Sequence, residues 1–167
     1  MTHYAGPLLT AETLASMRTA QAAGARHWRG SLDLGRSQHE AGLAPDGFAW
    51  QGRTWPYPEK LKERSIHFWN GSDWETAARF SGRLIKLVPS GWGAPTFEID
   101  GIKMLPTAQV SPYDDAQRKV ALIAPAGKTV LDTCGGLGYF AAHCLQAGAT
   151  RILSFEKNAD VLWLRTL

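Results

Sequence analysis

Short alternating runs of apolar residues, separated by Gly, Pro, Asn and Asp, dominate residues 28–104. Such runs are typical of strands in antiparallel sheets. Asp100-Gly101 gives the strongest turn signal, because alternating apolar residues flank it, with Ile99 before and Ile102 after. Trp55–Pro58 is predicted as a surface turn. The pattern predicts a small antiparallel β region with strands at Ser31–Leu34, Phe48–Trp50, Ile66–Trp69, Ala78–Phe80, Leu84–Val88 and Thr96–Ile99.

A helical period replaces this pattern near the N-terminus. Residues 8–23 are rich in alanine, and Leu14, Met17 and Ala20 are spaced three apart, so that they fall roughly on one helical face. Gly24 is well placed to end the helix. We expect an amphipathic helix that packs against the rest of the chain.

A second helix is predicted to begin at Ser111-Pro112, just before the most informative stretch of the chain. Asp114 and Asp115 fall in its first turn, where the helix dipole favours carboxylates. Capping explains both acids. A second interpretation, which depends on the family resemblance described below, keeps Gln109 and Asp115 as candidates for ligand contact.

Residues 129–156 have the pattern of a strand, a tight turn, a helix and a second strand. Thr129–Asp132 is a short apolar, β-branched run typical of a buried parallel strand, and Arg151–Phe155 is a second apolar strand, which ends at Glu156. Gly136 and Gly138 lack a Cβ, so that their backbone can approach a ligand closely. Glu156 follows Gly138 by 18 positions, close to the roughly 20-residue offset at which an acid meets a ribose diol. A nucleotide-type site is predicted.

The acid at Asp132 narrows the class of ligand. A nicotinamide dinucleotide loop keeps that position small, so that the helix N-terminus can take the pyrophosphate. A carboxylate there would repel a pyrophosphate, whereas it would attract a cationic amino-acid ligand. A nicotinamide-dependent oxidoreductase is therefore the least favoured interpretation.

Val130–Gly138 resembles the first motif of class I S-adenosylmethionine-dependent methyltransferases, and Phe155–Asn158 resembles their second. The wider block, from Gly93–Met104 through Ser111–Lys119 into the loop, is similar to a prokaryotic group of predicted methyltransferases described as spermine-synthase-like. The resemblance covers roughly residues 30–167. One departure is Cys134, which stands where the motif usually has its first glycine.

The resemblance implies S-adenosylmethionine as the cofactor. Asp132 and the following loop backbone would surround its methionine part, Glu156 would hold the ribose, and Lys157 and Asn158 would lie near the adenine. The implied cofactor-binding residues are Asp132, Thr133, Cys134, Gly135, Gly136, Gly138, Tyr139, Glu156, Lys157 and Asn158.

The predicted fold class is α/β, in three segments: an N-terminal helix in residues 1–27, a β-rich subdomain in 28–106, and the start of a Rossmann-like cofactor-binding domain in 107–167. A complete sheet of the methyltransferase type has more strands than the two present here. We therefore expect a truncated chain, inactive alone, that belongs to a longer protein or completes its sheet against another chain, as in a homo-oligomer.

Composition argues against a disordered, membrane-spanning or disulfide-rich protein. With 44% hydrophobic and 20% charged residues, the 167-residue chain is typical of a globular protein. No apolar run approaches a membrane span, and a cytoplasmic setting is predicted. Cys134 and Cys144 indicate neither a disulfide framework nor a metal site.

Neither the net charge nor the histidines decide between the possible functions of the chain. The net charge is +3, with the basic excess before residue 90. These basic residues could bind a nucleic acid, with tryptophans as stacking platforms. We favour the interpretation that they lie on solvated faces over a Trp- and Phe-rich core. No spacing pairs His39 or His67 with a catalytic partner. The alternatives to a methyltransferase are an aminopropyltransferase and a noncatalytic cofactor- or nucleic-acid-binding module; neither a general base nor a methyl acceptor is identified.

Overall fold

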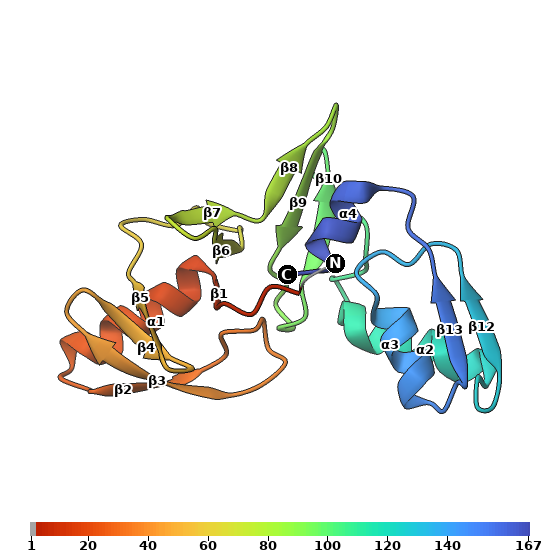
Figure 1. Ribbon diagram of the computed structural model, residues 1–167, viewed down its shortest axis with the longest axis horizontal. Helices are drawn as coiled ribbons and strands as arrows, with labels where there is room; N and C mark the ends of the chain where they lie inside the picture. The colour runs from red at the N-terminus through yellow and green to blue at the C-terminus, as the bar shows by residue number, and fades with distance from the viewer. Residues whose placement is uncertain (1–2) are drawn as a thin grey trace. The chain divides into compact units, whose positions relative to one another are not determined.

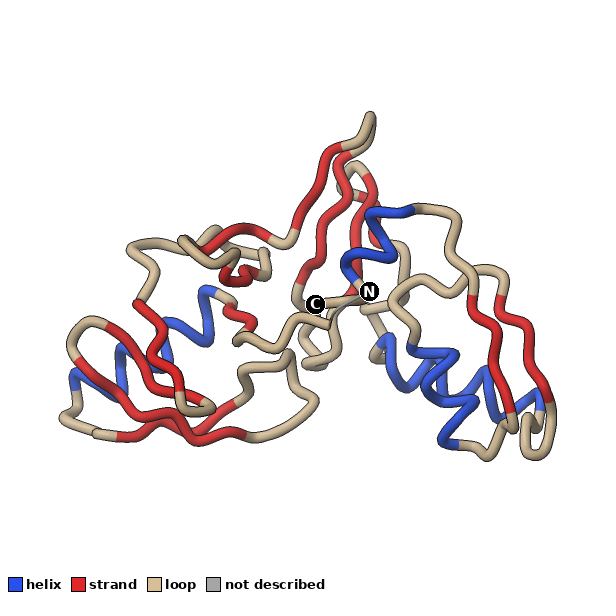
Figure 2. Tube along the Cα trace, in the orientation of Figure 1, coloured by secondary structure: helices blue, strands red, loops and turns tan. Residues whose placement is uncertain are grey.

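The computed structural model describes residues 3–167 (Figure 1). The chain divides into two compact units, residues 5–77 and residues 78–167 together with 3–4. Figure 2 marks the helices and strands of each unit. No helix in residues 3–167 has the length and apolar character needed to cross a membrane.

Residues 5–77 form two antiparallel sheets, with strand orders β2-β3-β4-β5 and β1-β6-β7. Gln51 and Gly52 join β4 to β5 with φ angles of 50° and 72°. Positive φ at both central residues is what a two-residue hairpin turn needs. The elements are β1 Leu8–Leu9, α1 Ala11–Ala22, β2 His27–Gly30, β3 His39–Ala44, β4 Gly47–Trp50, β5 Arg53–Pro56, β6 His67–Trp69 and β7 Trp74–Thr76.

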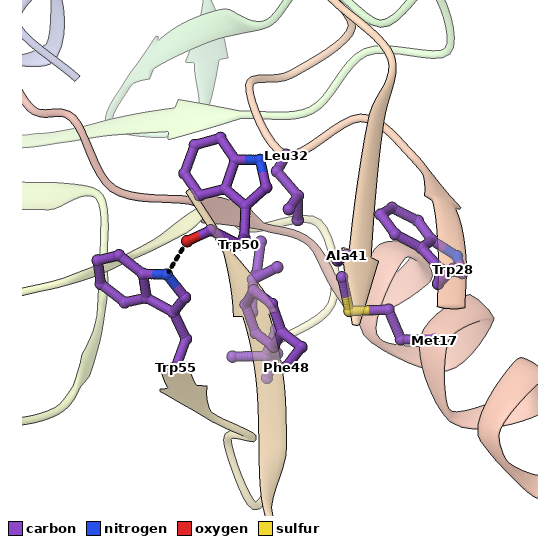
Figure 3. Close-up of a cluster of buried hydrophobic side chains, with 9 residues drawn as sticks. Met17, Trp28, Leu32, Ala41, Phe48, Trp50 and Trp55 are labelled. Carbon is purple, nitrogen blue, oxygen red and sulfur yellow. Dashed lines mark hydrogen bonds between the residues drawn. The ribbon is translucent and has the colours of Figure 1, made fainter. Parts of the chain in front are cut away.

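Aromatic side chains build the core of this unit (Figure 3). Phe48 is fully buried, and Trp28, Trp50 and Trp55 are each 7% exposed. The Trp55 indole N–H donates to the Trp50 carbonyl oxygen at 3.4 Å. The prediction of a Trp- and Phe-rich core is confirmed, and these rings are therefore not available as stacking platforms.

Helix α1 confirms the predicted N-terminal helix with shorter bounds. Thr10 caps it, because its hydroxyl oxygen accepts from the Thr13 N–H at 3.1 Å. Met17 is fully buried in the unit's core. Leu8 and Leu9, which were expected in the helix, instead pair with β6 as strand β1.

Residues 78–167 hold one antiparallel sheet, one parallel pair of strands and three helices. The sheet order is β11-β10-β9-β8, and the hairpin predicted at Asp100-Gly101 is confirmed, with Ile99 opposite Ile102. The elements are β8 Ala78–Phe80, β9 Leu84–Val88, β10 Thr96–Ile99, β11 Ile102–Lys103, α2 Pro112–Ile123, β12 Thr129–Asp132, α3 Tyr139–Gln146, β13 Arg151–Ser154 and α4 Ala159–Leu164.

Strands β12 and β13 pair in parallel across α3, with Asp132 opposite Ser154. Helices α2 and α3 pack on each other beside this pair (Figure 1). Val130 and Ile152 pack into a small cluster around Val120 and Cys144. Side chains alternate between the faces of a strand, so the next residues, such as Leu131, point to the opposite face, where Leu131 is 62% exposed.

The prediction of an α/β fold with the start of a Rossmann-like sheet is wrong. Residues 3–167 form four separate small sheets; three are antiparallel, and the fourth contains only β12 and β13. A doubly wound fold needs a longer run of parallel strands with helices on both faces. Here Leu131 and Leu153 remain exposed on the second face. The predicted strand–turn–helix–strand unit is present, but it does not extend into such a sheet. The N-terminal segment also differs from the prediction, because strand β1 precedes the first helix.

Two local predictions also fail. Ser31–Leu34 is not a strand, because the Asp33 carboxylate accepts from the Ser37 N–H at 3.0 Å and Leu34 adopts a φ of 59°. Side-chain bonds of this kind compete with sheet pairing. Trp55 lies in β5 opposite Phe48 rather than in a surface turn. Burial of the indole outweighs the turn preference of the neighbouring prolines.

Candidate functional site

The glycine turn between β12 and α3 has the backbone that its sequence requires. Gly136 and Gly138 have φ angles of +48° and +88°. The Gly138 N–H donates to the Gly135 carbonyl oxygen at 2.8 Å, which closes the turn just before α3. A Cβ at position 136 would meet only the Phe97 ring, at 3.7 Å. At Gly136 the turn therefore leaves open space beside bare backbone.

Asp132 ends β12 with its carboxylate fixed and nearly buried. The side chain is 8% exposed. One oxygen accepts from the Ser154 hydroxyl at 2.7 Å, and the other accepts from the Cys134 N–H at 3.3 Å. No salt bridge within residues 3–167 neutralises Asp132. Its negative charge is thus available to a ligand.

Glu156 binds the same turn from the side of β13. One carboxylate oxygen accepts from the Gly136 N–H at 3.0 Å, and the other accepts from the Asn158 N–H at 2.9 Å. Asn158 in turn caps α4, because its side-chain oxygen accepts from the Asp160 N–H at 2.8 Å. The structure therefore brings the two acids singled out in the sequence onto one turn.

A hollow of about 360 Å³ lies beside the turn. This volume falls within the usual range of small-molecule sites. Its walls are residues 131–137 of β12 and the turn, Tyr139 and Phe140 of α3, Leu105, and Pro112, Asp115, Ala116 and Lys119 of α2.

The hollow gathers some of the predicted cofactor residues and leaves others out. Six of the ten line it: Asp132, Thr133, Cys134, Gly135, Gly136 and Tyr139. Gly138, Glu156, Lys157 and Asn158 do not. Of the second pair of candidates, Asp115 lines the hollow and Gln109 does not.

Sequence analysis missed Arg165, which supports the turn from the end of α4. Its Nε–H donates to the Gly136 carbonyl oxygen at 2.9 Å, and its Nη1 donates to the Ser154 hydroxyl at 3.3 Å. A Cβ on Gly135 would collide with the Arg165 guanidinium and the Ser154 hydroxyl. No local signal predicts this contact, because Arg165 lies 29 positions from Gly136.

Lys119 was also missed, although its spacing gives a signal. It lies one helical turn after Asp115, and its Nζ is 2.6 Å from the Asp115 carboxylate. Pairs at this spacing are neighbours on a helix surface. Both side chains face the hollow, with exposed fractions of 61% for Lys119 and 23% for Asp115.

The two cysteines differ in environment. Cys134 is exposed in the turn, whereas Cys144 is buried in α3. Burial raises the pKa of the Cys144 thiol, and the negative charge of Asp132 raises it further. Cys144 therefore lacks the thiolate character that a nucleophile needs.

His39 has a polar cluster of its own in the other unit. Its Nε2 lies 2.8 Å from the Ser37 hydroxyl and 3.2 Å from the Asp33 carboxylate. Because serine and aspartate meet the same ring nitrogen, this is not the arrangement of a nucleophile, base and orienting acid, in which they use opposite nitrogens. Within residues 3–167 no group of three His, Cys, Asp or Glu side chains could hold a metal.

Comparisons with known proteins add one relative. The chain matches no family model. It is 41% identical, over 103 residues, to an uncharacterized protein of Methanocaldococcus jannaschii. The match covers 61% of this chain and 35% of that protein. The chain thus spans about a third of the length of the relative that it matches.

Proposed function

We propose that the chain binds S-adenosylmethionine in the hollow and forms the cofactor-binding part of a methyltransferase. One observation carries the proposal: two carboxylates bind the backbone of one glycine turn. Asp132 accepts from the Cys134 N–H, and Glu156 accepts from the Gly136 N–H. The resemblance of Val130–Gly138 and Phe155–Asn158 to methyltransferase motifs supports the same conclusion.

The charges and hydrogen-bonding groups suit this cofactor. It carries a positive sulfur and an ammonium group, and Asp132 offers an unneutralised carboxylate in the wall of the hollow. Glu156 does not line the hollow itself, but it binds the N–H of Gly136, which does. Each Glu156 oxygen accepts one backbone N–H, which leaves lone pairs for ribose hydroxyls at this edge of the hollow. These residues therefore fit both the charged and the sugar parts of the molecule.

The chain's own contribution would be alignment. S-adenosylmethionine supplies a methyl group that the positive charge on its sulfur already activates, so fixed geometry is the main requirement. Arg165 holds the Gly136 carbonyl, and Ser154 holds the Asp132 carboxylate. Together they fix the turn against which the cofactor would lie.

Calorimetry on the 167-residue chain tests the proposal. S-adenosylmethionine should bind, and NAD⁺ should not, because Asp132 would repel its pyrophosphate. Asp132→Asn keeps the shape of the side chain and removes its charge. We expect this variant to lose about tenfold or more in affinity, since hydrogen bonds to charged groups contribute about 1.5–3 kcal/mol.

The matched control is Asp114→Asn. Asp114 is an exposed acid in the first turn of α2 and does not line the hollow. This variant should bind S-adenosylmethionine like the unmodified chain. Failure of the unmodified chain to bind at millimolar concentration, or equal losses in both variants, would overturn the proposal. Circular dichroism checks that both variants remain folded.

A further inference from the structure

Side chains of both charge signs share the hollow. Asp132 and Asp115 are negative, and Lys119 is the only Lys or Arg among its lining residues. Asp132 is held by Ser154 and by the turn backbone, whereas Lys119 is held by its ion pair with Asp115. The walls therefore present a fixed negative group and a more mobile positive one.

Lys119 can change partners at little cost. Its side chain is 61% exposed, and an exposed ion pair at helical spacing contributes little to stability. A ligand carboxylate in the hollow could therefore share the ammonium group of Lys119 with Asp115. Lysine offers three donors on a flexible stem, which suits this sharing.

We propose that Lys119 recognises the carboxylate of a zwitterionic α-amino-acid group, whose ammonium group Asp132 attracts. This inference rests on the proposed binding of S-adenosylmethionine and specifies its methionine end. It makes Lys119 a specificity-determining residue, because only the carboxylated cofactor has a group for Lys119 to bind. The decarboxylated cofactor that aminopropyltransferases use keeps the ammonium group but has no carboxylate, so Lys119 would face that cation with nothing to offset it.

The test compares three ligands that share the methylthioadenosine part. S-adenosylmethionine has the complete amino acid, decarboxylated S-adenosylmethionine lacks only the carboxylate, and 5′-methylthioadenosine lacks the whole amino-acid chain, so that its sulfur is uncharged. Calorimetry with Lys119→Met should show about tenfold weaker binding of S-adenosylmethionine, because a charge-assisted contact is lost. Binding of 5′-methylthioadenosine should be unchanged, and that of the decarboxylated cofactor unchanged or tighter.

Two further variants separate recognition of the carboxylate by Lys119 from a general effect of positive charge on α2. Lys119→Arg keeps a cation and should retain the preference for the carboxylated cofactor. Arg118→Ala removes a cation from an exposed neighbouring position of α2 that does not line the hollow, and it should bind all three ligands normally. The loss should therefore be specific to one position and one ligand.

The possible failures are distinguishable. If the unmodified chain binds none of the three adenosine compounds, the proposed function fails, and this inference fails with it. If the unmodified chain binds S-adenosylmethionine and Lys119→Met keeps the same preference over the decarboxylated form, only the assignment of Lys119 is overturned. An equal loss in Arg118→Ala would overturn it as well.

Discussion

Residues 5–77 and residues 129–155 use their apolar side chains in opposite ways. In the first region Phe48 is fully buried among tryptophans. In the second, Leu131 and Phe155 are about 60% exposed, while the polar Asp132 and His143 are buried. Burial of apolar area stabilises a fold, whereas a buried carboxylate costs free energy unless it is bound. The comparison indicates that the first region supplies stability, and the buried carboxylate of the second is consistent with the ligand site proposed above.

The largest effect should come from the aromatic core. Phe48→Ala removes a fully buried ring that stacks against Trp74. We expect it to lower the free energy of unfolding of residues 5–77 by about 3–5 kcal/mol. Amide hydrogen exchange in β3 and β4 measures this loss locally.

Phe155→Ala is the matched comparison. Phe155 is 58% exposed after β13, so we expect a loss of less than about 0.5 kcal/mol, measured by hydrogen exchange in β12 and β13. Similar losses from the two phenylalanines would contradict the division of roles between the regions.

Gly135→Ala, in the glycine turn, should cost less stability than Phe48→Ala but should weaken cofactor binding more. The new Cβ of Gly135→Ala would collide with Arg165 and Ser154 and lie 3.1 Å from the Phe155 carbonyl oxygen. The side chains can move, but the backbone cannot move as easily, so we expect a cost of about 1–3 kcal/mol. Displacing Arg165 also frees Gly136, so calorimetry should show weaker binding of S-adenosylmethionine.

Gly91→Ala is the control for this substitution. A Cβ at position 91 meets nothing within 4 Å. It should leave both stability and cofactor binding unchanged. If Gly135→Ala behaves in the same way, the contact of Arg165 with the turn is not what fixes the loop.

The smallest effect is pH-dependent and belongs to residues 5–77. Burial alone would raise the pKa of Asp33, but hydrogen bonds from Ser37, Ser31 and His39 outweigh it and lower the pKa from 3.8 to about 2. A carboxylate whose pKa is lower in the folded state stabilises the fold above its unfolded pKa. The stabilisation should therefore be complete above about pH 4 and lost as the pH falls to about 2.

Asp33→Asn isolates this contribution. The full pKa difference corresponds to about 2 kcal/mol, and solvent screening of the 27% exposed side chain reduces it to about 1 kcal/mol. Denaturant unfolding at pH 5 should show the variant less stable by about that amount, and at pH 2 most of this difference should be gone. A difference that does not change with pH would assign the effect to the loop backbone instead.

Local signals were sufficient where neighbouring residues decide the structure. Asp100-Gly101 forms its hairpin and Ser111 caps its helix, because turns and caps depend on a few adjacent residues. Thr129–Asp132 is a strand with the predicted bounds. The glycine turn likewise follows from residues that cannot be replaced without strain.

Long-range contacts explain what the sequence could not reveal. The larger sheet was inferred from one local unit, and nothing in residues 129–156 specifies how many strands surround them. One failure has a local cause: Asp33 interrupts a segment that alternates like a strand, because its carboxylate accepts from the Ser37 N–H four positions later. Arg165 reaches the turn from another helix, and no pattern near Gly136 announces it.

The contrast between Cys134 and Cys144 has a practical consequence. These are the only two cysteines in the 167 residues; one is exposed in the wall of the hollow, and the other is buried with a raised pKa. A maleimide dye reacts with accessible thiols and would therefore attach to the first. The natural chain thus provides a single labelling point from which fluorescence could report molecules entering the hollow, without any engineered thiol.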